Sequence, residues 1–338
     1  MRDIRTGVIG CGYWGPNLVR NFNDNIRTHL RYACDLNPQR LKPLRLRYPH
    51  IKATEDYRDI LRDATVDAVA IATPVSTHYS LVREALEAGK HVFVEKPLAA
   101  RVREAEKLVN LAEKQGLVLF VDHIFIYTSA IRKIKEYLTA GRIGEMFYFD
   151  SVRINLGLFQ SDVNVIWDLA PHDLATMDYL IGELPESIVA TGSSHTPSGL
   201  EDVAYMTLKF RGDLIAHFHV NWMSPVKIRR IIIGGSKQML LYDDLDPADK
   251  IKVYDKGIIV PRRDKSSLYQ SMIQYRIGDM YAPSIDNTEA LKTAVDHFAD
   301  CILRKKRPVT DGMAGLRVVK MLEAANRSLK RGGARVSL

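Results

Sequence analysis

Three short stretches of the chain combine residue types that suit acid–base chemistry. The first is Glu95-Lys96-Pro97, where two opposite charges follow an apolar run and precede a proline. A lysine beside a reacting hydroxyl can donate a hydrogen bond to the oxygen and stabilise its developing charge. A cis Lys96–Pro97 bond would turn this lysine toward a cleft. The alternative is an ion pair at an exposed strand end, which contributes little to stability.

The second stretch spans residues 167–173 and contains Asp168 and His172. If it opens a helix, the two side chains lie one turn apart on one face. Histidine titrates in the working range of most enzymes, so His172 suits a general acid or base. Asp168 suits a helix N-cap equally well. A metal site would need further ligands, and since none stands out nearby we expect no metal.

The third stretch contains Thr73, Pro74 and His78, directly after another apolar run. Ligands bind beyond the carboxyl ends of parallel strands, where Thr73 would supply a hydroxyl and Pro74 would stiffen the turn. His78 opens the next helical pattern, and a capping or packing role is as compatible with its position as a binding role.

A glycine pattern near the N-terminus indicates what binds beside these stretches. Gly10-x-Gly12-x-x-Gly15 separates an apolar run from a helical pattern, as in the dinucleotide-binding fingerprint. Asp35 ends the next apolar run, where an acidic residue binds ribose hydroxyls and repels a 2′-phosphate. We therefore predict NAD as the cofactor, with Arg40 the one nearby cation that would weaken the preference over NADP. The alternative is a glycine turn in some other βαβ unit. The candidate cofactor-binding residues are Gly10, Gly12, Tyr13, Trp14, Gly15, Asp35, Thr73, Pro74, His78, Glu95, Lys96 and Pro97.

The elements that position these residues alternate in the βαβ manner up to residue 122. Most strand candidates are apolar over most of their length, as in sheets covered on both faces. We predict a doubly wound parallel sheet of the Rossmann type. Its strands are Arg5–Ile9, Leu30–Asp35, Ala68–Ala72, His91–Glu95 and Leu117–Asp122, and its helices are Pro16–Asn25, Pro38–Tyr48, Tyr57–Asp63, Thr77–Ala88 and Arg101–Gln115.

The pattern changes after residue 122, which divides the chain into a cofactor domain (1–122) and a second α+β domain (123–338). Period-two strands joined by short turns predict an open, mostly antiparallel sheet. The expected strands are Met146–Arg153, Ser187–Ser194, Val203–Phe210, Leu214–Asn221, Ile228–Gly234 and Met239–Tyr242. The expected helices are Tyr127–Thr139, Asp168–Ile181, Asn287–Arg304 and Gly312–Arg331, with loops at Asn155–Val165 and 255–286.

The bulk properties exclude several classes of protein. A chain of 338 residues with 46% hydrophobic and 26% charged residues fits two ordinary globular domains. The formal net charge is +8, but the cations are scattered and no nucleic-acid motif accompanies them. No apolar run is long enough for a membrane helix, no signal peptide is evident, and the three cysteines form no metal or disulfide pattern. We expect a cytoplasmic protein with no nucleic-acid or membrane partner.

Taken together and in this order, the glycine fingerprint, Asp35, Thr73-Pro74 with His78, Glu95-Lys96-Pro97 and Asp168-x-x-x-His172 resemble the glucose–fructose oxidoreductase / inositol dehydrogenase / MocA family. The resemblance spans essentially the whole chain. It implies a catalytic pair, Lys96 and His172, with Asp168 beside them. It also places Asp122 and His123 on the substrate side and makes the open sheet a dimer interface, so we expect a homodimer or homotetramer. Family members often carry glycines before Asp-x-x-x-His, whereas this chain has Asn164-Val165-Ile166-Trp167.

The expected activity is that of an NAD-dependent dehydrogenase acting on a CH–OH group of a sugar. The form of the glycine loop and the polar stretch 153–157 are most similar to members that act on nucleotide-linked sugars, for surface polysaccharides or unusual sugars. The candidate substrate-binding residues are Asp122, His123, Arg153, Asn155, Asp168 and His172. The alternatives are a dehydrogenase of free polyols such as inositol and a non-catalytic NAD-binding regulator, against which the presence of Lys96, Asp168 and His172 argues.

Overall fold

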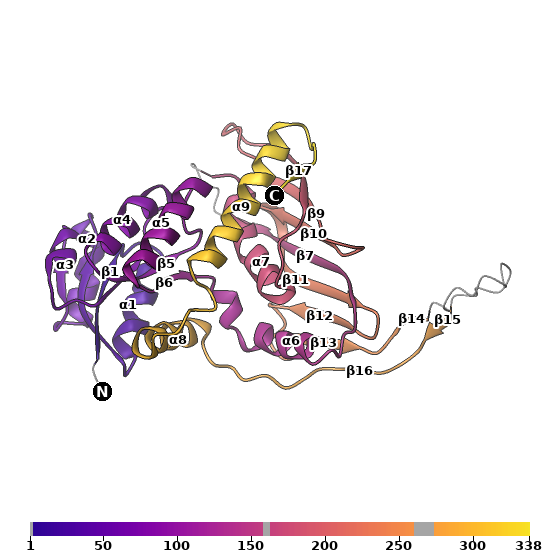
Figure 1. The fold of residues 1–338 in the computed structure, drawn as a ribbon, viewed down its shortest axis with the longest axis horizontal. Helices are drawn as coiled ribbons and strands as arrows, with labels where there is room; N and C mark the ends of the chain where they lie inside the picture. The colour runs from indigo at the N-terminus through magenta and orange to yellow at the C-terminus, as the bar shows by residue number, and fades with distance from the viewer. Residues whose placement is uncertain (1–2, 158–162, 260–273) are drawn as a thin grey trace. The chain divides into compact units, whose positions relative to one another are not determined.

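The chain folds into two compact units (Figure 1). The computed structural model describes residues 3–157, 163–259 and 274–338. The first unit comprises Met1–Thr128 with Thr288–Glu323, and the second comprises Ser129–Asn287 with Ala324–Leu338. Residues near the C-terminus thus pack with the N-terminal part of the chain. A division by function at residue 122 stays a prediction.

The first unit contains a six-stranded parallel sheet, which confirms the predicted Rossmann-type architecture. Its strand order is β3-β2-β1-β4-β5-β6. The strands are β1 (Ile4–Ile9), β2 (Thr28–Cys34), β3 (Lys52–Thr54), β4 (Ala68–Ile71), β5 (His91–Glu95) and β6 (Leu119–Asp122). Strand order reverses at β1, so ligands are expected outside the carboxyl ends of β1 and β4. The sequence did not predict β3, since three residues are too few to show a period.

Helices cover both faces of this sheet. Helices α4 and α5 pack together on one face, and α1 and α8 pack together on the other (Figure 1). The helices are α1 (Gly15–Asp24), α2 (Pro38–Arg47), α3 (Arg58–Arg62), α4 (Val75–Glu87), α5 (Val102–Gln115) and α8 (Ala290–Arg304), with a 3-10 turn η1 (Ile124–Tyr127) after β6. An aromatic cluster fills the space between α1, α8 and the sheet. Phe298 of α8 makes edge-to-face contacts with Phe22, Phe93 and Phe120. Burial of the Phe298 ring in this cluster holds α8 in the first unit.

The second unit contains a nine-stranded sheet in the order β16-β13-β12-β11-β7-β10-β9-β8-β17. Its bounds are β7 (Met146–Leu156), β8 (Ser187–Ser193), β9 (Val203–Lys209), β10 (Ile215–Asn221), β11 (Met223–Gly235), β12 (Met239–Asp243), β13 (Ile251–Tyr254), β16 (Met280–Tyr281) and β17 (Val336–Ser337). The pairs are antiparallel except β7 with β10, which are parallel. The prediction of a mostly antiparallel sheet is confirmed.

Two expected loops are corrected in part. Strand β7 continues to Leu156, so the loop expected from Asn155 begins later, and residues 158–162 lie outside the described residues. Within 255–286, β14 (Gly257–Ile259) pairs with β15 (Gln274–Arg276), and β16 pairs with β13. Residues 260–273 lie outside the described residues. These strands were missed because two or three residues are too few to show an alternating pattern, and pairing with a neighbouring strand defines them.

Helices lie on one face of the second sheet (Figure 1). They are α6 (Ser129–Thr139), α7 (Val165–Ile181) and the last part of α9 (Gly312–Lys330). Alternate residues of β9 follow this asymmetry, since Met206 and Leu208 are buried while Tyr205 is 42% exposed. Within the described part of the chain, no helix covers the opposite face. No helix in that part is long and apolar enough to span a membrane.

Candidate active site

The glycine loop between β1 and α1 has the geometry that a dinucleotide requires. Gly10 has φ +93°, and an added Cβ would lie 2.5 Å from the Ala72 carbonyl oxygen. At Gly15 a Cβ would lie 2.1 Å from the Gly10 carbonyl oxygen, so the helix packs directly on the turn. At Gly12 the nearest atom to an added Cβ is Arg40 Nη1, at 3.6 Å, which leaves the backbone open to approach. These features fit a pyrophosphate at the start of α1.

Asp35 lies where the ribose hydroxyls of a dinucleotide are expected. The side chain is buried, and its carboxylate accepts hydrogen bonds from the backbone N–H groups of Cys11 and Asn37, each at 2.8 Å. Arg40 also reaches it, with Nη1 3.4 Å from Oδ2. The cation that was expected only to lie nearby is therefore in contact with Asp35. It partly offsets the repulsion that the carboxylate would exert on a 2′-phosphate.

The turns after β4 and β5 are tied together by His78. Its two ring nitrogens lie 2.8 Å from the Pro97 carbonyl oxygen and 2.9 Å from the Thr73 carbonyl oxygen. Burial lowers the His78 pKa, with a smaller contribution from the charge of Lys96. His78 therefore has the packing role that the sequence left open. Its role in cofactor binding stays a prediction, as do those of Thr73 and Pro74.

The Glu95-Lys96-Pro97 stretch lies at the carboxyl end of β5, and the Lys96–Pro97 bond is cis, as the sequence suggested. Glu95 is in register with Asp122, which ends the neighbouring strand β6. His123 follows directly, and both Asp122 and His123 are only 1% exposed. The carboxyl ends of two adjacent strands therefore bring Glu95, Lys96, Asp122 and His123 to one edge of the first sheet.

Several polar atoms at this edge have no hydrogen-bond partner among the described residues. They are Glu95 Oε1, both Asp122 carboxyl oxygens, both His123 ring nitrogens and Trp14 Nε1. Glu95 and Trp14 lie close enough to the Asp122 carboxyl to lower its pKa, but neither meets hydrogen-bond geometry with it. Buried groups without partners are rare away from ligand sites.

Burial shifts the protonation of these groups. It raises the Asp122 pKa to about 6. Burial, and then the charge of Asp122, raise the Glu95 pKa well above its ordinary value. Burial lowers the His123 pKa to about 3, helped by the charges of Lys96 and Arg317. His123 is thus neutral at neutral pH, and a proton on the two carboxyl groups is favoured.

Asp168 and His172 lie one turn apart on α7 of the second unit, as predicted, and both are partly exposed. The helix begins earlier than predicted, at Val165. Its N-cap is Asn164, whose side chain accepts a hydrogen bond from the Trp167 N–H at 3.2 Å. The N-cap alternative for Asp168 is therefore wrong.

Trp222 contacts Asp168, and the sequence did not predict this contact. Its Nε1–H donates to Asp168 Oδ2 at 2.9 Å, and the side chain is 1% exposed. An added Cβ at Gly157 would lie 2.5 Å from Trp222 Cδ1, so the backbone packs directly against the indole. The only signal in the sequence was a tryptophan at the end of a strand, which gives no indication of its partner.

Arg153, an expected substrate ligand, is bonded within the second unit. Its Nε lies 2.8 Å from Asp173 Oδ2 and its Nη2 lies 2.7 Å from Asp173 Oδ1, and both residues are buried. This bidentate pair joins β7 to α7 immediately beside His172. Asn155 is half-buried further along β7, and its substrate role stays a prediction.

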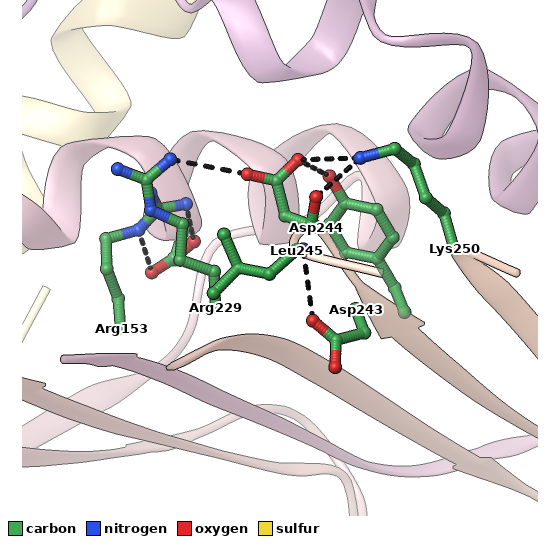
Figure 2. Close-up of polar contacts among 8 residues, drawn as sticks. Arg153, Arg229, Asp243, Asp244, Leu245 and Lys250 are labelled. Atoms are coloured by element: carbon green, nitrogen blue, oxygen red, sulfur yellow. Dashed lines mark hydrogen bonds and ion pairs between the residues drawn. The ribbon is translucent and has the colours of Figure 1, made fainter. Parts of the chain in front are cut away.

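A second set of polar contacts adjoins this pair (Figure 2). Asp244 accepts hydrogen bonds from Arg229 Nη1 at 3.3 Å and from the Tyr242 hydroxyl at 2.9 Å, and Lys250 Nζ lies 3.7 Å from it. The contacts tie β11, β12 and the following turn together. Among the described residues, no group of three or more His, Cys, Asp or Glu side chains could hold a metal ion.

The fold and the glycine loop define an NAD-binding oxidoreductase of the Rossmann type. Two family models match the chain. "Oxidoreductase family, NAD-binding Rossmann fold" matches residues 4–123, and "GFO/IDH/MocA C-terminal domain" matches residues 131–241. The chain belongs to the GFO/IDH/MocA family, as its motifs suggested, and its cofactor is NAD.

Similar proteins span nearly the whole chain. UDP-N-acetylglucosamine 3-dehydrogenase of Acidithiobacillus ferrooxidans is 27% identical over 94% of this chain and 95% of its own. Its crystal structure superposes with a TM-score of 0.83 at 25% identity, over 99% of this chain and 100% of that one. Myo-inositol 2-dehydrogenase of Thermotoga maritima is 25% identical over 97% of this chain and 96% of its own.

Proposed function

We propose that this protein is an NAD-dependent dehydrogenase that oxidises a hydroxyl group, or reduces the corresponding ketone, on a nucleotide-linked sugar. The observation that carries the proposal is the fixed arrangement on α7, where Trp222 holds Asp168 one turn from His172. A buried indole that donates to a partly exposed carboxylate orients that carboxylate for a ligand. Similarity to a UDP-N-acetylglucosamine 3-dehydrogenase over nearly the whole chain supports the sugar class.

In the proposed reaction, NAD supplies the hydride acceptor when it is bound. The His172 imidazole takes the proton from the substrate hydroxyl, because histidine exchanges protons near neutral pH. The Lys96 amine donates a hydrogen bond to the same oxygen and stabilises its negative charge. Asp168 orients His172 or binds a neighbouring substrate hydroxyl. In the reverse direction His172 returns the proton to the oxygen.

Arg153 has a positioning role in this proposal and does not bind the substrate. Its two bonds to Asp173 fix α7 on β7 at the residue that follows His172. In the first unit, Gly10, Gly12 and Gly15 with Asp35 bind the pyrophosphate and ribose of the cofactor. Tyr13 is 92% exposed beside Gly12 and is available to cover the bound dinucleotide.

A dehydrogenase of a free polyol is the second candidate. The similarity to a myo-inositol 2-dehydrogenase over 97% of the chain favours it. A thermal-shift screen with NAD present separates the two. Nucleotide sugars should raise the melting temperature and support NAD reduction, whereas stabilisation and turnover only with inositol or other free polyols would favour the second candidate.

We also propose that the protein is a cytoplasmic homodimer or homotetramer. Its three cysteines are buried thiols, which suits a reducing compartment. The uncovered sheet face carries Tyr205 stacked on His219, with ring centroids 4.5 Å apart, and would be buried in an oligomer. Light scattering should give a multiple of 38.3 kDa, and a stable monomer at micromolar concentration would contradict the proposal.

A further inference from the structure

Glu95 and Asp122 are placed as a pair by the first sheet. They are register partners at the last positions of the adjacent parallel strands β5 and β6, so their side chains leave the sheet at the same edge. The Asp122 oxygens and Glu95 Oε1 are buried and have no hydrogen-bond donor among the described residues. Two adjacent buried carboxylates repel each other, and a single proton held between them removes the repulsion and satisfies one acceptor.

The groups around this edge determine the charge it can carry. They are Lys96 after β5, His123 after β6, Trp14 before α1, Tyr127 in η1 and Arg317 in α9. His123 and Tyr127 are neutral at pH 7, since burial lowers the His123 pKa to about 3 and raises the Tyr127 pKa. The charge of Lys96 acts on Glu95, Asp122 and His123 alike. Lys96 is therefore the cation that the two carboxyl groups share.

We infer that Glu95 and Asp122 act as one carboxyl pair that shares a proton, and that its single negative charge positions the Lys96 amine at the end of β5. The second half of this inference rests on the proposed role of Lys96 toward the substrate oxygen. Neither carboxyl group touches the reacting atoms in this account. Both are positioning residues that act through Lys96.

The shared proton is tested without any turnover. Infrared spectra at pH 7 should show the carbonyl band of a protonated carboxylic acid in the wild-type protein. The band should be weaker in Glu95→Gln and in Asp122→Asn, because each change removes the neighbouring carboxyl group that shares the proton. Glu113→Gln, at an exposed position on α5, is the matched control and should keep the band. Absence of the band from the wild type, or an undiminished band in both single variants, would contradict the shared proton.

Unfolding against pH gives a second readout. A carboxyl whose pKa is raised to about 6 in the folded state binds its proton more tightly when folded, so its contribution to stability is lost as pH rises from about 4 to about 6. Asp122→Asn should remove this loss, and the difference between wild type and variant isolates it from other groups. An unchanged pH dependence would contradict the shared proton.

The positioning of Lys96 is tested by combining the two substitutions that replace a carboxyl group with an amide. Each single variant keeps one negative charge, so its kcat should fall less than that of the double variant. Glu95→Gln/Asp122→Asn removes the charge and should lower kcat tenfold or more, with melting temperature and NAD affinity as checks on folding. In a Lys96→Met background the same double change should have no further effect on kcat. Equal kcat in single and double variants would overturn the positioning role. Absence of turnover with every sugar in the wild type would instead reject the proposed function, since the infrared result is independent of turnover.

Discussion

At the scale of single residues, a buried hydrogen-bond partner determines whether a polar side chain is available to a ligand. Trp222 and Asp173 are the clearest cases, because each holds a side chain named from the sequence, Asp168 or Arg153. The first contact leaves Asp168 oriented beside His172. The second bonds two nitrogens of the Arg153 guanidinium to Asp173. Residue type alone suggested a ligand in both places, and the bonded partner separates the two roles.

Trp222→Phe removes one hydrogen bond and keeps most of the buried ring. The loss of an Nε1–H donor to Asp168 should cost about 1 kcal/mol of unfolding free energy. We expect kcat to fall about tenfold, since a misoriented group loses its transition-state contact, while NAD affinity stays constant. Steady-state kinetics, cofactor titration and chemical denaturation on the same protein check this. An unchanged kcat in a destabilised variant would show that the Trp222 contact contributes to stability and not to the reaction.

We expect Arg40 to affect the relative affinity of the protein for NAD and NADP. Because its guanidinium contacts Asp35 and borders Gly12, it should contribute most of any affinity for a 2′-phosphate. We expect wild type to bind NAD more tightly than NADP. Arg40→Ala should raise the Kd for NADP about tenfold, as loss of a charge-assisted bond of about 1.4 kcal/mol does, and change the Kd for NAD little. Fluorescence titration measures both constants. Tighter NADP binding by wild type would contradict the assignment of Asp35.

At the scale of elements, the parallel strands were predictable and the partners of the helices were not. Strand β5 was predicted with its observed bounds because a strand covered on both faces is a continuous apolar run. The start of α7 was missed because Asn164, and not Asp168, satisfies its first N–H groups. The packing of α8 in the first unit depends on Phe298 meeting rings far away in the sequence, and no local pattern carries that information.

The attachment of α7 to β7 gives a stability prediction. Arg153→Met leaves Asp173 buried without its partner, which should cost about 3–5 kcal/mol of unfolding free energy. Arg153→Met/Asp173→Leu removes both charges and should be more stable than Arg153→Met alone. Guanidinium chloride unfolding of the three proteins measures this. A double variant less stable than the single one would show that the pair contributes net stability beyond satisfying its own charges.

At the scale of the whole molecule, the proposed chemistry is divided between the two units. Lys96 belongs to the first unit with the glycine loop, and Asp168 and His172 belong to the second. The motifs made both halves visible in the sequence, because each is a short local pattern. The neighbours of these motifs are far away in the sequence and meet only in the folded chain. Trp222 contacts Asp168, and Asp122 lies beside Glu95.

The most direct measurement is kcat for wild type, Lys96→Met, His172→Ala and the double variant, with NAD affinity and melting temperature on each. If both side chains act on one hydroxyl, each single variant should lose about a hundredfold or more in kcat. The double variant should lose little more than the worse single one, because the two groups serve the same proton transfer. NAD affinity should stay nearly constant, since the glycine loop and Asp35 bind most of the dinucleotide. A folded His172→Ala protein with wild-type kcat would contradict the account.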